Sequence, residues 1–174
     1  MRCVHVLAAV CMAAIVSGCN RPDPIRLQPT IEEPPTLASV IRISDPSTSS
    51  QLVRGFYALE GNGWRWTSPK FGVVLQTPVG ARQNGAKLLL VFNLAQASIQ
   101  ALKSITIAAK AGGMELSPEE YTMAGEHSYA RVLPGSLFVG ERIEVDFAVN
   151  KFLRLPNDDR QLALVVTRIG LEPK

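Results

Sequence analysis

One short stretch of the chain gathers the side chains best suited to contacting a ligand. Tyr57, Glu60, Trp64, Arg65 and Trp66 follow one another closely, and they include both tryptophans of the chain. Aromatic faces are electron-rich and stack on the axial C–H groups of sugar rings, which carry partial positive charge. The acid and the arginine could hydrogen-bond to sugar hydroxyls. These five residues are therefore candidate ligand-binding residues.

A structural role for the same residues is the main alternative. Along a strand, Trp64 and Trp66 point to one side and Arg65 to the other. Two large side chains on one face usually mark that face as core, and tryptophan is highly buried on average. Glu60 would then pair with Arg65 or Arg160. The alternation favours this structural role over ligand contact.

Residues that could carry a reaction are few. His127 is the only histidine after the expected signal peptide, which excludes a metal site with two or more His or Cys ligands. The acids of residues 157–159 lack the spacing and the glycine of a calcium loop, so we expect a turn there. No G-x-S-x-G motif surrounds Ser128 or Ser136. We predict no catalytic residue, no metal, no cofactor and no enzymatic activity, with His127 in an exposed loop.

The aromatic stretch resembles a motif of small bacterial β-sandwich modules. Its Gly-Phe-Tyr-Ala-Leu-Glu and Trp-Arg-Trp-Thr segments are similar to G-[FW]-Y-x-x-E followed by x-R-W-[ST]. Residues 155–171 look like the final turn and strand of these modules, although Ala163 stands where glycine is usual. Such modules occur as lipoproteins or attached to cell-surface polysaccharide enzymes such as glycosyltransferases. The resemblance implies a sandwich architecture and a cell-surface setting, and it supplies no activity.

The N-terminus resembles the signal peptide of a bacterial lipoprotein. Residues 16–19 read Val-Ser-Gly-Cys, similar to a lipobox, and follow Arg2 and the apolar residues 4–16. An apolar run of this length suits a signal-peptide core and is well short of the ~20 residues of a membrane-spanning helix. The resemblance implies that residues 1–18 are removed and that Cys19 carries palmitate and further acyl chains.

The residues after the lipobox suggest where the protein is tethered. Asn20 is not the aspartate that retains lipoproteins at the inner membrane, so the resemblance favours the outer membrane. Residues 19–36 are rich in proline, which favours an extended spacer that could reach about 50 Å. Residues 37–174 form the single expected domain. Cys3 and Cys11 lie in the signal peptide, so no disulfide is expected.

The rest of the chain is typical of an all-β protein. Short runs with period-two alternation are separated by Gly, Pro and Asn, which predicts an antiparallel β-sandwich of jelly-roll or immunoglobulin-like type. Gly61 and Gly63 predict a hairpin. Residues 94–103 are the one candidate helix. The expected strands are 40–43, 55–59, 64–67, 71–76, 87–94, 104–110, 129–133, 142–150 and 162–171, with a turn at Ser68 and Pro69 between the third and the fourth. Alternation places four rows of residues each on one face of its strand: Leu88, Leu90 and Phe92; Ile105, Ile107 and Ala109; Ile143, Val145, Phe147 and Val149; and Val165, Thr167, Ile169 and Leu171.

These patterns predict a lipid-anchored envelope protein that binds surface polysaccharide without turning it over. The alternative is an assembly lipoprotein that engages another envelope protein through a sheet face or edge strand. The formal charge of +3 is too small to indicate a nucleic-acid partner.

Overall fold

The computed structural model describes residues 37–61 and 63–174. The expected signal peptide, Cys19 and the tether lie outside these residues, as does Asn62. The described part contains eleven strands: β1 Val40–Arg42, β2 Leu52–Glu60, β3 Trp64–Gln76, β4 Ala86–Leu94, β5 Ile105–Ala111, β6 Met114–Tyr121, β7 Gly125–Leu133, β8 Arg142–Val149, β9 Leu153–Leu155, β10 Asp158–Leu162 and β11 Val165–Pro173. Two short α-helices, α1 Ala81–Asn84 and α2 Gln96–Leu102, connect strands. No helix of the described residues is long and apolar enough to cross a membrane.

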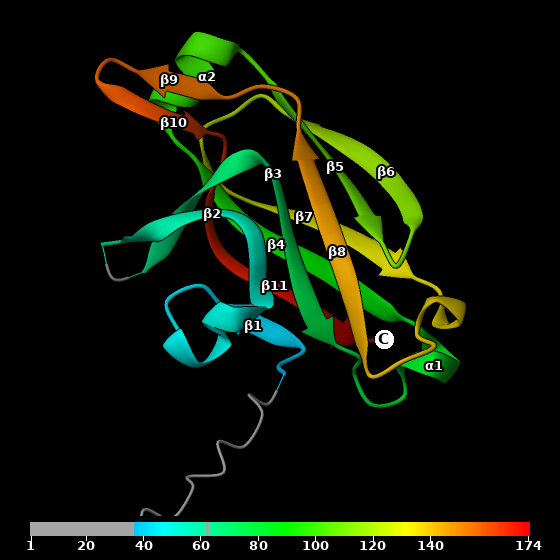
Figure 1. The fold of residues 1–174 in the computed structure, drawn as a ribbon. Helices are drawn as coiled ribbons and strands as arrows, with labels where there is room; N and C mark the ends of the chain where they lie inside the picture. Colours follow the sequence, from blue (N-terminus) through cyan, green and yellow to red (C-terminus); the bar gives the residue numbers. More distant parts are fainter. Residues whose placement is uncertain (1–36, 62) are drawn as a thin grey trace, which may run out of the picture. The chain divides into compact units, whose positions relative to one another are not determined.

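Nine strands form one antiparallel sheet that folds over on itself (Figure 1). The order is β6-β5-β8-β3-β11-β4-β7, with β2 paired to β3 and β1 to β11. One half of the sheet runs from β6 to β3 in this order, and the other half runs from β3 to β7. Strand β3 belongs to both halves, because its Arg65 and Trp66 pair with β11 and its residues from Lys70 onward pair with β8. This arrangement confirms the predicted all-β, antiparallel sandwich.

The inner faces of the two halves enclose one hydrophobic core. Phe71 and Phe147 stack with their ring centroids 4.9 Å apart in one half, and Tyr129 of the other half meets Phe147 edge-on at 6.4 Å. The predicted inward rows of β4, β5 and β8 are all buried. Burial of apolar area is the main term that stabilises such a core, which has no disulfide among the described residues.

Side chains join the two ends of the sheet where β6 and β7 meet. The Tyr121 hydroxyl donates to the carbonyl of Ser128 at 3.1 Å, and the Tyr129 hydroxyl donates to that of Ser117 at 2.8 Å. Burial raises the pKa of Tyr121 and of Tyr129, which keeps both hydroxyls protonated as donors. Strand β6 was not predicted. It contains Pro118, which fits a strand at the edge of a sheet, where β6 lies.

The sequence predicted two strands where the structure has the single strand β3. Pro69 was expected to end the first of them, but it lies where β3 changes partner from β11 to β8. The β2–β3 pairing is also irregular here, because Gly55 of β2, whose φ is +74°, lies opposite residues 68–71 of β3. The missing N–H of the proline therefore leaves no ladder bond unmade.

Two further predictions were wrong. His127 lies in β7, partly buried between Phe92 and Tyr121, because this strand begins at Gly125 rather than at Tyr129. The second wrong prediction placed Val165 and Thr167 on the same face of their strand as Ile169 and Leu171. A bulge between Val166 and Arg168 shifts the alternation, so that Val166, Ile169 and Leu171 are buried.

Candidate functional site

The strand register turns both tryptophans away from the core. One row of register partners runs across four neighbouring strands, β3, β11, β4 and β7. Its members, in that order, are Trp66, Val165, Asn93 and Glu126. Partners in an antiparallel ladder point to the same side, and both Asn93 and Glu126 are exposed. Trp64 lies two residues from Trp66 and shares its side.

The neighbouring row of the ladder points inward. Arg65 pairs with Val166, and Val166 with Phe92, and these last two are both 0% exposed. The interpretation of the tryptophan face as core is therefore wrong. Both indoles are only partly buried and neither belongs to the hydrophobic core.

A shallow hollow of about 420 Å³ lies over the outward indoles. We call it the tryptophan hollow. Its polar lining offers carboxylate, amide and hydroxyl groups, which is the set of donors and acceptors that sugar hydroxyls use. The lining residues are Glu60, Trp64, Trp66, Phe92, Asn93, Glu126, Val165 and Thr167.

The β2–β3 hairpin holds the Trp64 indole. Glu60 pairs with Trp64, and the Gly63 N–H donates to the Glu60 carbonyl at 3.2 Å, which confirms the predicted hairpin. Gly61 has a φ of +54°, and a Cβ at this position would lie 2.0 Å from the Trp64 ring. The indole therefore occupies space that only glycine leaves open.

Replacing Gly61 with alanine is expected to displace the Trp64 indole. The new methyl group cannot share the space of the ring, and the positive φ adds strain of about 1 kcal/mol. Tryptophan emission should shift and any ligand affinity of the hollow should fall several-fold. Gly113→Ala is the matched control, because that glycine also has a positive φ but nothing within 4 Å of its Cβ position. Equal effects of the two replacements would show that strain alone is responsible.

Glu60 joins the hairpin to the C-terminal turn. Arg160 donates to Glu60 at 2.8 Å and to Asp158 at 2.8 Å, and its guanidinium lies 5.4 Å from the centre of the Tyr57 ring. Hydrogen bonds from Arg160 hold the pKa of Asp158 below its ordinary value. The sequence predicted that Glu60 pairs with Arg65 or Arg160, and the structure shows the ion pair with Arg160. Residues of both motifs that carry the family resemblance thus contact each other directly.

The five predicted binding residues divide into two groups. Glu60, Trp64 and Trp66 line the tryptophan hollow. Tyr57 and Arg65 do not: the Tyr57 hydroxyl accepts from the Gln161 N–H at 3.1 Å, and Arg65 donates to the Tyr57 carbonyl at 2.9 Å. Their hydrogen bonds stabilise the β2–β3 hairpin, and neither residue lines the tryptophan hollow.

Sequence reasoning missed three polar residues of the hollow, namely Asn93, Glu126 and Thr167. They belong to three different strands and meet only through the register of the sheet. Asn93 could have been noticed in the sequence, because it is a polar residue in the most apolar run of the chain. Such a residue at an outward position of a central strand is a candidate surface contact.

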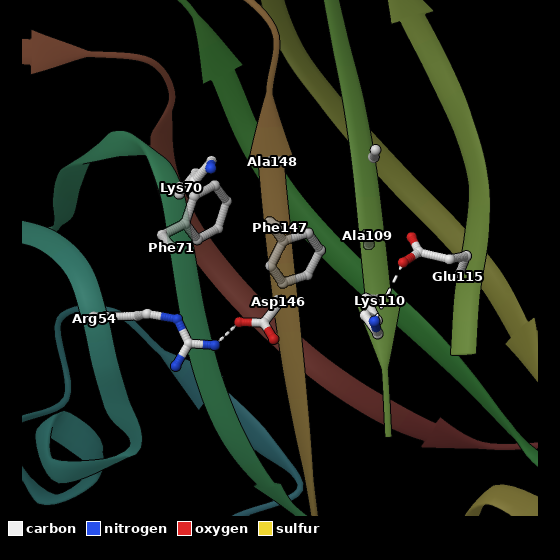
Figure 2. Close-up of a pocket in the computed structure, with 10 residues that line it drawn as sticks. Arg54, Lys70, Phe71, Ala109, Lys110, Glu115, Asp146, Phe147 and Ala148 are labelled. Carbon is white, nitrogen blue, oxygen red and sulfur yellow. Dashed lines mark ion pairs between the residues drawn. The ribbon is translucent and has the colours of Figure 1, made fainter. Parts of the chain in front are cut away.

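A second hollow of about 330 Å³ lies on the outer face of the other half of the sheet (Figure 2). Arg54 reaches across β3 to Asp146, and Lys110 approaches Glu115 at 3.4 Å. Arg54 also pairs with Glu144 at 2.7 Å. Because these charged groups neutralise one another and no aromatic side chain faces outward there, the tryptophan hollow is the better candidate site.

The described residues contain no group of three or more His, Cys, Asp or Glu side chains that could hold a metal ion. In the tryptophan hollow, Glu60 is held by Arg160 while Glu126 stands on β7. Asn157, with a φ of +63°, lies in the turn between β9 and β10, but Asp158 and Asp159, which were predicted to belong to this turn, begin β10.

No protein-family model and no curated protein matches the chain. Among solved structures, an acetyl xylan esterase from the rumen bacterium Butyrivibrio proteoclasticus is similar at 14% identity and a TM-score of 0.45. The similarity covers 80% of this chain and 33% of the esterase, so the chain spans about a third of that protein.

Two further solved structures are similar. A CBM4 structure has 9% identity and a TM-score of 0.35, over 78% of this chain and 85% of the other. A structure of CBM51-2 in complex with GlcNAc and INT domains, from Clostridium perfringens ZmpB, has 9% identity and a TM-score of 0.33, over 77% of this chain and 28% of the other.

Proposed function

We propose that this protein is a lipid-anchored, non-catalytic domain of the bacterial cell envelope that binds polysaccharide through the tryptophan hollow. The observation that carries the proposal is the outward orientation of Trp64 and Trp66, neither of which belongs to the hydrophobic core. Partly exposed indoles beside polar side chains suit a sugar chain, since they combine stacking with hydrogen bonding.

The cost of leaving the indoles outside supports a binding role. A tryptophan that is fully buried gains several kcal/mol from the removal of its area from water, and the two indoles forgo part of that gain. Both indoles line the same hollow, which gives that hollow an aromatic surface for a ligand.

Affinity electrophoresis tests the proposal. The probe is polysaccharide extracted from the envelope of the bacterium that carries the gene, cast into a native gel. The protein is the chain from residue 20 onward, here called the soluble chain, which lacks only the expected signal peptide and Cys19 and contains every described strand. We expect retardation that increases with polymer concentration. Unchanged mobility, together with a specific protein adduct on cross-linking in cells, would favour the assembly role instead.

A further inference from the structure

Two arginines stand side by side on the outer face, next to the tryptophan hollow. Arg42 of β1 is the register partner of Arg168 of β11. The preceding pair, Ile41 and Ile169, is 0% exposed, so both arginines point away from the core. Like charges directly opposite each other on neighbouring strands destabilise a sheet. A bound anion would remove that repulsion.

Only one of the two guanidinium groups forms an ion pair with a described residue. Arg168 forms an ion pair with Glu172, whereas no carboxylate of residues 37–61 or 63–174 lies within salt-bridge distance of Arg42. The nearby Asp45 accepts hydrogen bonds from Ser47 at 2.7 and 2.9 Å. Arg42 is exposed, so its guanidinium donors are available to a ligand.

The arginines and the indoles belong to one continuous surface. A hollow of about 490 Å³ is lined by Arg42, Arg168 and five neighbours, among them Glu126 and Thr167. These last two residues also line the tryptophan hollow. A ligand long enough to occupy both hollows, such as a polymer, would meet rings at one end and cations at the other.

We infer that the polysaccharide is anionic, and that Arg42 and Arg168 hold its carboxylate or phosphate groups while its sugar rings stack on the indoles. This inference rests on the proposed function. The planar guanidinium fork matches the two oxygens of a carboxylate or phosphate. The exposed Glu126 repels an anion at the junction of the two hollows, which favours the arginine end for the charged group.

Affinity electrophoresis of the soluble chain tests the inference with three forms of the extracted polysaccharide: native, carboxyl-reduced and phosphatase-treated. We expect the dissociation constant to rise about tenfold on the removal of whichever anionic group is recognised. Arg42→Gln should weaken binding to the native polymer about fivefold and reduce its dependence on salt, since a charge-assisted contact is lost. Arg142→Gln, which removes the same charge from the exposed start of β8, is the matched control and should bind like the unmodified chain.

The outcomes separate the inference from the proposed function. Equal binding of all three polymer forms, with Arg42→Gln indistinguishable from the control, would overturn the inference and leave polysaccharide binding intact. Failure of the native polymer to retard the unmodified chain would overturn both. A loss of the same size in Arg42→Gln with all three polymer forms would assign Arg42 a structural role and contradict the inference.

Discussion

Replacing Trp64 and Trp66 together with alanine is expected to abolish retardation by envelope polysaccharide while leaving the domain folded. Each indole that stacks on a sugar ring contributes roughly 1–2 kcal/mol, so the double change should weaken binding on the order of a hundredfold. Neither ring belongs to the hydrophobic core, so the unfolding temperature should change little. Electrophoresis and thermal unfolding of the same preparation measure the two effects.

The matched control keeps aromatic rings at both positions. Trp64→Phe with Trp66→Phe retains stacking faces of smaller area and should retain a clear part of the affinity. Full binding by the double alanine variant would contradict the assignment of the site. A large loss of stability in that variant would instead support the structural role that the sequence pattern favoured.

Replacing Cys19 with serine is expected to move the protein from the membrane fraction to the soluble fraction. The variant lacks the thiol that would be acylated, and stable anchoring needs at least two acyl chains. Labelling with palmitate should disappear, and fractionation should recover nearly all of the variant in the soluble fraction.

Cys11→Ser is the matched control for the anchor, because it removes another cysteine of the expected signal peptide. Membrane association and palmitate labelling should be unchanged in this variant. Continued labelling of the Cys19→Ser protein, or its persistence in the membrane fraction, would contradict the lipoprotein assignment without affecting the tryptophan hollow.

The sequence predicted the class of fold well because period-two alternation reports directly on burial. The inward rows of β4, β5 and β8 contain only apolar residues at alternate positions, and all of these are buried. The bulge after Val166 escaped prediction because nothing in residues 165–171 distinguishes a bulged strand from a regular one.

The orientation of the tryptophans was missed because β3 was divided at Pro69. Counting back by twos from the buried Phe71 through a continuous strand brings Thr67 and Arg65 inward and Trp66 and Trp64 outward. Because the prediction interrupted the strand, the inward direction of Phe71 could not be extended to the tryptophans. The average burial of tryptophan was used instead, and it favoured the core.

The residues beside the indoles depend on long-range pairing. Thr167 and Glu126 reach the tryptophan hollow only because β11 lies between β3 and β4, and β4 beside β7. Pairing between strands far apart in sequence is not encoded in local alternation, so these contacts require the folded structure.

Tryptophan fluorescence of the soluble chain tests the central claim most directly, because both tryptophans of the protein line the same hollow. Without ligand, the emission should be quenched readily by acrylamide in solution. Saturating envelope polysaccharide should shift the emission to shorter wavelength and protect it from the quencher, as sugar rings displace water from the indole faces. Emission and quenching that stay unchanged while the polymer retards the protein in a gel would show that binding occurs elsewhere and would contradict the account.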